Sequence, residues 1–186
     1  LEQEGVQPDI LAVAKGLAGG YVPLGAALCS AQVFAPLGVF GTGHTFSGHT
    51  AACAAALAVQ RVIDRDGLLP RVKANGDRLK AWFGQALADV EEVGDIRGRG
   101  HFIALELVAN RATKAPFDPE RRLFLKIRAQ AMENGLICYP VGGNVDGRAG
   151  DIVILAPPYN ASDDELIEIV DKTATSVRQV LGREGV

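Results

Sequence analysis

The 186-residue sequence lacks the features that mark secreted, membrane-spanning and nucleic-acid-binding proteins. It has no secretory signal and no apolar run that approaches the length of a membrane span. Its net charge of −3 offers no basic surface for nucleic acid or for an anionic membrane. It also has no internal repeat or low-complexity tract. Because 48% of its residues are hydrophobic and 22% are charged, we expect an ordered globular protein without nucleic-acid or membrane partners.

Cysteine is scarce, with Cys29, Cys53 and Cys138 scattered along the chain. They form no CxxC pair and have no histidine at metal-ligand spacing, which argues against a metal site and a disulfide framework. We therefore expect reduced, buried or semi-buried thiols in a cytoplasmic protein. Cys53 lies inside an alanine-rich helical pattern, so it is expected to be a small core residue.

Lys15 is the leading functional candidate. It ends the apolar, strand-like run of residues 9–15 and is followed at once by the glycine-rich residues 16–20. A primary amine at a strand terminus, beside backbone that a ligand can approach, is suited to Schiff-base chemistry. The alternative is a surface lysine at a place where the chain turns back to water.

The residue pattern in the first part of the chain predicts strands, loops and one helix. Residues 26–30 are continuously apolar, which is typical of a short buried strand. A second glycine-rich loop, residues 38–43, leads to the segment GHTFSGH at residues 43–49. From Thr50 to about Arg65, high helix propensity and small side chains on every face predict a well-buried helix.

The second part predicts helices that alternate with short strands. A helix is expected over residues 68–89, with its apolar face formed by Leu79, Trp82, Phe83 and Leu87. The further predicted elements are a turn at 96–101, a strand at 102–108, an amphipathic helix at about 120–134, and short strands at 136–139 and 152–155 around a glycine-rich loop at 142–150. The last helix begins at a capping box formed by Ser162 and Glu165.

Two sequence blocks carry a resemblance to a known family. PDILAVAKGLAGG at residues 8–20 and GHTFSGH at residues 43–49, followed by the alanine-rich helix, resemble the class III aminotransferases, which are pyridoxal-phosphate enzymes of fold type I. The later segments at residues 98–100, 106–108 and 156–158 also resemble blocks of this family. The similarity therefore covers nearly the whole chain.

The resemblance implies an α/β fold of two structural lobes. Residues 1–72 would be the end of the large cofactor-binding domain and residues 73–186 the small C-terminal domain. The family's carboxylate for the pyridine nitrogen, its ring-stacking aromatic residue and its other phosphate loop lie upstream of the lysine block, and this sequence starts after them. Our hypothesis is that the chain is the C-terminal portion of a longer enzyme and transaminates poorly or not at all by itself.

The resemblance also implies roles for individual residues. Lys15 would form the internal aldimine with pyridoxal 5'-phosphate and then act as the general acid/base. Thr45 would bind the cofactor phosphate from the neighbouring subunit, which implies a homodimer with shared active sites. Without the family block, the preferred interpretation of Thr45 is instead a residue of a Ser/Thr turn or the N-cap of the alanine-rich helix.

Substrate specificity is suggested by a departure from the family pattern. Members that act on α-carboxylates such as ornithine commonly carry an arginine two residues before the Ala-Pro-Pro block, and this chain has Ile154 there. The chain is therefore more similar to the ω-amino acid or amine:pyruvate branch. Arg148 is the nearest candidate for a mobile carboxylate-binding arginine, or it is a solvated surface residue. Tyr21 would line the pocket or serve in packing.

The resemblance implies a transaminase that moves an amino group from an amine or ω-amino acid to a keto acid such as pyruvate. Two alternatives stay open. One is an aminomutase or decarboxylase of the same family, which would use the same lysine and cofactor. The other is a catalytically inactive fragment that acts as a structural or interaction module. His44 and His49 lack a third ligand for a metal, and His101 is expected to be structural.

Overall fold

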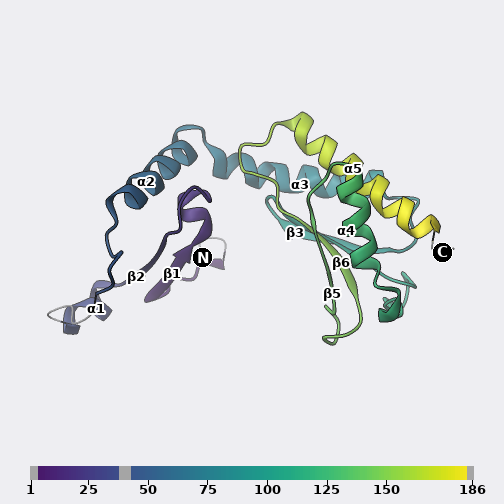
Figure 1. Ribbon diagram of the computed structural model, residues 1–186, viewed down its shortest axis with the longest axis horizontal. Helices are drawn as coiled ribbons and strands as arrows, with labels where there is room; N and C mark the ends of the chain where they lie inside the picture. Colours follow the sequence, from purple (N-terminus) through teal and green to yellow (C-terminus); the bar gives the residue numbers. More distant parts are fainter. Residues whose placement is uncertain (1–3, 38–42, 184–186) are drawn as a thin grey trace. The chain divides into compact units, whose positions relative to one another are not determined.

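The computed structural model describes residues 4–37 and 43–183 (Figure 1). The chain divides into two compact units, Leu1–Gly67 and Leu68–Val186, and each is described by itself. The assignment of residues 1–72 and 73–186 to two domains of the family stays a prediction. The glycine-rich loop expected at residues 38–43 lies, apart from Gly43, outside the described residues.

The first unit contains an antiparallel strand pair and a long helix. In chain order its elements are β1 (Ile10–Ala14), η2 (Lys15–Ala18), β2 (Gly25–Cys29), α1 (Ala31–Phe34), η3 (Ala35–Leu37) and α2 (Thr50–Arg65), where η denotes a 3-10 helix. Strands β1 and β2 pair with Ile10 opposite Cys29 and Ala14 opposite Gly25. The predicted strands and helix of this region are therefore present.

The burial predicted for this unit is wrong. Every residue of β2 is exposed, and α2 buries only Ala52 and Ala56. Cys29 and Cys53 are exposed as well, although a buried or semi-buried thiol was expected at both positions. The physical reason is that β1 and β2 form a two-stranded sheet, and an apolar element becomes buried only where another layer packs against it. Cys138, in the second unit, is half-buried as predicted, and burial raises the pKa of its thiol.

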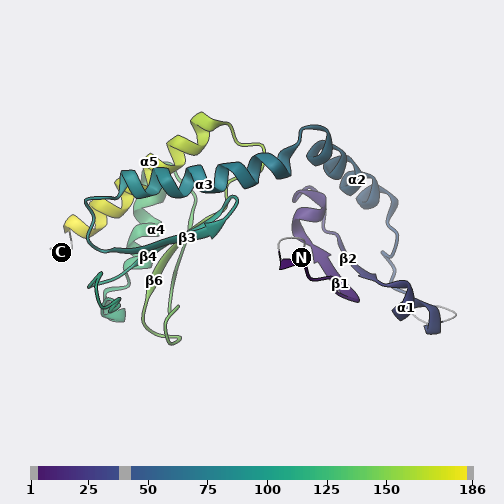
Figure 2. The same ribbon diagram turned by 180° about the vertical axis from the view of Figure 1, so that it is seen from behind.

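The second unit is a four-stranded antiparallel sheet with helices (Figure 2). Its elements are α3 (Leu68–Ala86), β3 (Val93–Arg99), β4 (Phe102–Leu107), η4 (Pro119–Arg121), α4 (Leu123–Glu133), β5 (Tyr139–Gly142), β6 (Asp151–Leu155) and α5 (Asp163–Arg183). The strand order is β3-β4-β6-β5. Along β4 and β6 buried residues alternate with partly exposed ones, so one face of the sheet carries the core.

The hydrophobic core lies between that face and the helices. Leu79 and Phe83 of α3, Ile103 and Leu105 of β4, and Leu166 of α5 belong to one cluster of buried side chains. The apolar face predicted for the helix over residues 68–89 is confirmed, with Trp82 partly buried at its margin. The helical spacing in α3 therefore indicated correctly which side of this helix is buried.

The capping box of α5 is confirmed. The backbone N–H of Glu165 donates to Ser162 Oγ at 3.2 Å, and the N–H of Ser162 donates to Glu165 Oε2 at 2.6 Å. The bonds that the Glu165 carboxylate accepts from the N–H and the hydroxyl of Ser162 hold the pKa of this carboxyl below its usual value. A side-chain acceptor at the first turn satisfies backbone donors that have no partner inside the helix.

Two strand boundaries differ from the prediction. The residues predicted as a turn, 96–101, largely belong to β3, which begins at Val93 and pairs with β4. The strand predicted at 136–139 lies at Tyr139–Gly142, opposite β6. In both cases the cross-strand register decides the boundary, and local sequence carries little information about register. Among the described residues, no helix is both long enough and apolar enough to cross a membrane.

Candidate active site

Lys15 lies where β1 ends, as the first residue of η2. Its φ is 54°, in the left-handed region. Residues other than glycine adopt that conformation at a cost, and they keep it only where the surrounding structure holds them. The Lys15 side chain is exposed. The chain therefore turns sharply at Lys15 and leaves its Nζ accessible.

The turn after Lys15 is short and closed by glycine. Gly19 ends η2 with φ 60°, and its N–H donates to Gly16 O at 3.1 Å. The N–H of Tyr21 then donates to Ala18 O at 3.1 Å. Because the Tyr21 side chain is 83% exposed, it is not a packing residue of this unit. Lys15 and Tyr21 thus flank the same turn.

Thr45 lies in an exposed turn before α2. The N–H of Ser47 donates to His44 O at 2.9 Å, and the N–H of His44 donates to Ser47 Oγ at 3.2 Å. The N–H of His49 donates to Phe46 O at 3.2 Å. These bonds close the turn and leave the Thr45 side chain exposed.

The interpretation of Thr45 as the N-cap of α2 is wrong. The N-cap is His49, whose Nδ1 accepts from the N–H of Ala52 at 3.3 Å. Histidine is not among the residues that are usually favoured at a helix N-cap. Threonine is, and for that reason the sequence suggested Thr45 as the cap. Thr45 is therefore not occupied in capping α2.

Arg148 lies in the second compact unit, on the loop between β5 and β6. Asp146 Oδ1 accepts from the N–H of Arg148 at 2.8 Å and from that of Ala149 at 2.6 Å. These backbone donors hold the pKa of the Asp146 carboxyl below its usual value. The Arg148 side chain is exposed. The loop backbone is thus fixed by Asp146, while the guanidinium extends into solvent.

Ile154 is half-buried in β6, opposite Ala104 on one side and Tyr139 on the other. Ala104 in turn pairs with Arg97 on β3, so Tyr139, Ile154, Ala104 and Arg97 form one row across the sheet. Arg97 forms ion pairs with Asp95, at 3.0 Å, and with Glu106. The arginine that shares a row with Ile154 is therefore already engaged by two carboxylates.

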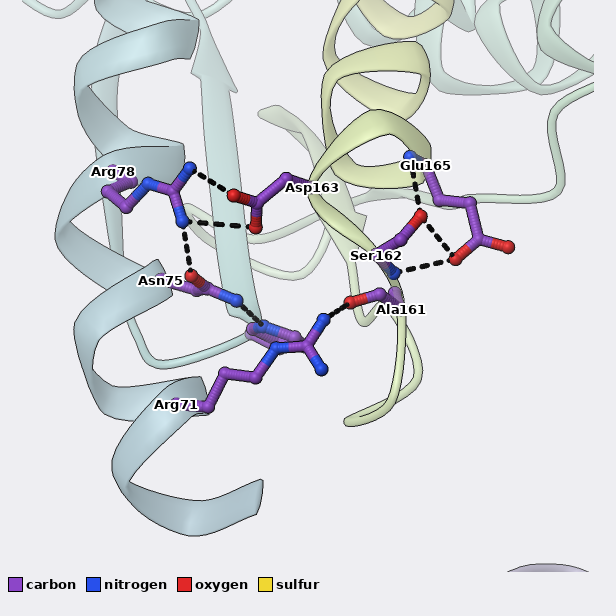
Figure 3. A network of polar contacts seen from close by, with 8 residues as sticks. Arg71, Asn75, Arg78, Ala161, Ser162, Asp163 and Glu165 are labelled. Carbon is purple, nitrogen blue, oxygen red and sulfur yellow. Dashed lines mark hydrogen bonds and ion pairs between the residues drawn. The ribbon is translucent and has the colours of Figure 1, made fainter. Parts of the chain in front are cut away.

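The segment after β6, which carries the Ala-Pro-Pro block, is held against α3 (Figure 3). Arg71, Asn75 and Arg78 of α3 reach toward it. Arg78 donates to Asp163 Oδ1 at 3.0 Å and Oδ2 at 2.7 Å, and these bonds lower the pKa of the Asp163 carboxyl. Arg71 donates to the carbonyl of Ala161. Two arginines thus bind both ends of a three-residue stretch.

His101 joins this network from the turn between β3 and β4. It is 3% exposed; its Nδ1 lies 3.1 Å from Pro158 O and its Nε2 lies 3.3 Å from Asn75 Nδ2. A carbonyl oxygen only accepts, so the ring donates from Nδ1 and accepts the Asn75 amide at Nε2. Asn75 Oδ1 accepts from Arg78 at 3.0 Å, which fixes the orientation of the amide. These contacts agree with a structural role for His101.

No three His, Cys, Asp or Glu side chains of the described ranges gather as they would around a metal ion.

Comparison with known proteins identifies the family. Residues 1–177 match the family described as Aminotransferase class-III. The chain belongs to the class III aminotransferases. It is 44% identical over 186 residues to a protein named aminotransferase from Gibberella zeae, covering 97% of this chain and 36% of that protein. It is 36% identical over 184 residues to the uncharacterized aminotransferase YodT of Bacillus subtilis, covering 95% of this chain and 41% of that protein.

Solved structures agree with this class III assignment. A transaminase from the marine bacterium Virgibacillus superposes with a TM-score of 0.92 at 31% identity, over 99% of this chain and 42% of that chain. A thermostable (S)-enantioselective omega-transaminase from Thermomicrobium roseum gives a TM-score of 0.85 at 34% identity, over 97% and 39%. The predicted family and fold are thus confirmed. The chain spans about two fifths of the length of these class III relatives.

Proposed function

We propose that Lys15 is the cofactor-binding lysine of a pyridoxal 5'-phosphate-dependent aminotransferase. The amino group would pass from an amine or ω-amino acid to a keto acid such as pyruvate. The observation that carries the proposal is the exposed amine of Lys15 on a left-handed backbone at the end of β1, in a chain of the class III family. A strained residue held at a strand terminus is typical of a functional position.

The glycines beside Lys15 and the exposed Thr45 both fit this cofactor. A Cβ placed on Gly16 or Gly20 would meet nothing within 4 Å, so a ligand can approach the backbone there. The exposed Thr45 hydroxyl, on a turn with backbone amides nearby, is suited to a phosphate oxygen. We therefore assign Lys15 to the cofactor aldehyde and Thr45 to its phosphate.

Pyridoxal 5'-phosphate, when bound, supplies an electron sink for the bond that breaks at the substrate carbon. Lys15 Nζ would hold the cofactor until the substrate amine takes its place. The released amine of Lys15 would then serve as the general acid/base that accepts and returns the proton of the substrate carbon. One amine therefore serves in turn as the anchor of the cofactor and as the carrier of the proton.

The preference for amines and ω-amino acids rests on Ile154. An apolar side chain there cannot form the bidentate bond that an arginine gives to an α-carboxylate. Arg148, exposed on the loop between β5 and β6, would bind the carboxylate of the keto acid, and Tyr21 would line the pocket. The similarity to the Thermomicrobium roseum structure, which is an omega-transaminase, supports this choice.

We further propose a cytoplasmic homodimer in which each active site takes Lys15 from one subunit and Thr45 from the other. Exposed Cys29 and Cys53 are compatible with a reducing compartment. The exposure of the Thr45 turn is compatible with a role toward a neighbouring subunit.

Borohydride trapping tests the role of Lys15. The full protein is incubated with pyridoxal 5'-phosphate, reduced and digested, and the peptides are weighed by mass spectrometry. The reduced cofactor should be found on the peptide that contains Lys15 in the wild type and in Lys73→Ala, a control at an exposed lysine of α3. Label on other lysines only, in the wild type, would reject the proposal.

Mixed dimers test the shared site. Lys15→Ala and Thr45→Ala proteins are each expected to bind cofactor poorly. A mixture that exchanges subunits should regain one intact site per mixed dimer, because that site takes Lys15 and Thr45 from different chains. If mixing restores no cofactor binding while the subunits exchange, Thr45 does not act across the dimer.

Product analysis separates transamination from the related reactions. With an amine donor and pyruvate, a transaminase yields alanine and the carbonyl form of the donor in equal amounts. Release of carbon dioxide would indicate a decarboxylase, and an isomeric amine formed without a keto acid would indicate an aminomutase.

A further inference from the structure

The turn that carries Lys15 is held by α2. Ala18, at the end of η2, is fully buried, and the buried residues of α2 are Ala52 and Ala56. Half-buried Val59 lies one helical turn further along the same face. This stripe of small and apolar residues faces η2.

Gln60, next to that stripe, adds a polar contact. Its Nε2 donates to the carbonyl oxygen of Leu17 at 3.0 Å. The last carbonyls of a short helix have no donor inside the helix and need one from outside. Those of Gly16 and Ala18 accept from the N–H groups of Gly19 and Tyr21. Gln60 thus serves the carbonyl between them, from a position 43 residues away.

The end of the turn is also confined sterically. Gly19 has φ 60°, and a Cβ placed on it would lie 3.2 Å from Cγ2 of Val59. Glycine at this position therefore lets the turn lie close to Val59, where a larger residue would have to displace the Val59 side chain. The Gln60 amide attaches the turn to α2 by a hydrogen bond.

We propose that Gln60 is a positioning residue for Lys15. The left-handed backbone of Lys15 persists only if its surroundings hold it, and η2, which begins at Lys15, is attached to α2 through Leu17 and Gly19. Removal of the Gln60 donor lets the turn move, and Nζ moves with it. This inference rests on the proposed function of Lys15.

Movement of Lys15 Nζ should slow the chemical step more than it weakens substrate binding. A proton carrier displaced by a fraction of an ångström still allows the substrate to bind, but it transfers the proton more slowly. Loss of one exposed hydrogen bond should therefore lower kcat about three- to ten-fold and change KM for the amine less than about two-fold.

Four substitutions in the full protein test this role. Gln60→Glu keeps the shape but replaces the donor with a carboxylate, and Gln60→Met removes all polarity at similar length. Gln60→Lys keeps an N–H donor and should retain most of the activity. Gln85→Met is the control, at an exposed glutamine of α3.

Two measurements are made on each protein. Steady-state kinetics give kcat and KM, and hydrogen exchange of the peptide covering residues 15–21, without cofactor, reports on the turn directly. We expect lower kcat and faster exchange in Gln60→Glu and Gln60→Met only. Unchanged kcat and exchange in both, with borohydride label on Lys15 in the wild type, would overturn the inference alone. Absence of that label on wild-type Lys15 would instead overturn the proposed function and this inference together.

Discussion

At the scale of the residue, Asp151 shows a buried charge placed to support a helix. It is 4% exposed, and its Oδ1 accepts from the N–H of Phe124 at 2.9 Å, in the first turn of α4. Arg122, the N-cap of α4, makes no side-chain cap bond. Asp151 therefore satisfies a donor that the helix itself leaves free, and its charge is favourable near the helix N-terminus.

Replacement of Asp151 by asparagine is expected to remove a pH dependence of stability. Burial raises the pKa of Asp151, so between its usual and its raised value the folded state holds a proton that the unfolded state has lost. The wild type should therefore lose unfolding free energy, relative to Asp151→Asn, as the pH rises from about 3 through the raised pKa. Urea titrations across this range measure the difference.

Asp151→Ala serves as the control. It lacks both the charge and the acceptor, so it should be less stable than Asp151→Asn at every pH. Parallel stability curves for the wild type and Asp151→Asn would contradict the prediction.

At the scale of the element, α3 meets the sheet through backbone as well as side chains. A Cβ placed on Gly76 would lie 2.6 Å from the backbone N and 2.7 Å from the Cα of Gly100, at the turn between β3 and β4. The neighbouring residue, Asn75, makes its contact with His101 at the same place. The close approach at Gly76 allows that polar contact to form.

Gly76→Ala and Gly84→Ala are predicted to change stability in opposite directions. At Gly76 the added methyl group meets backbone that cannot rotate away, so unfolding free energy should fall by about 1–3 kcal/mol. At Gly84, also in α3, a Cβ meets nothing within 4 Å, so alanine should add about 0.5–1 kcal/mol through helix propensity. Thermal or urea unfolding checks both. A neutral Gly76→Ala would show that this junction is loosely packed.

At the scale of the whole molecule, the two compact units differ in how much they bury. In the second unit, 20 hydrophobic residues form one buried cluster drawn from its helices and sheet. In the first, the buried hydrophobic residues of the described ranges are Ala18, Ala52 and Ala56. Because burial of apolar area is the main favourable term in folding, the second unit has by far the larger stabilising core.

The 186-residue chain studied by itself should reflect this difference. We expect limited proteolysis to cleave within residues 4–67 and to leave a resistant fragment that begins near Leu68. Hydrogen exchange should be slow in β4, β6 and α5 and fast in β1, β2 and α2. Equal protection of both units, or cleavage first within the second, would contradict the prediction.

Local patterns were sufficient for the helices and for the family. Helical spacing of Leu79 and Phe83, the capping box at Ser162 and the glycines after Lys15 are signals carried within a few residues, and each corresponds to a feature of the structure. The blocks around Lys15 and Thr45 indicated the class III aminotransferases for the same reason. Such blocks are recognisable because they keep particular residue types in a fixed order.

Contacts between distant residues decided the remainder. Strand register placed β3 and β5 differently from the prediction, because pairing depends on the partner strand. In the sequence, Gln60 is only an amide beside an apolar stripe. Its partner, the carbonyl of Leu17, is 43 residues away, so only the folded chain shows the contact.

The sequence by itself determined the helices, the strand before Lys15, the family and the candidate residues, because these depend on local propensity and on residue type. Only the tertiary structure decided that Lys15 has a left-handed backbone, that α2 holds its turn through Gln60, and that β2 is exposed. Burial and backbone strain depend on what packs against an element, and that is a property of the folded chain.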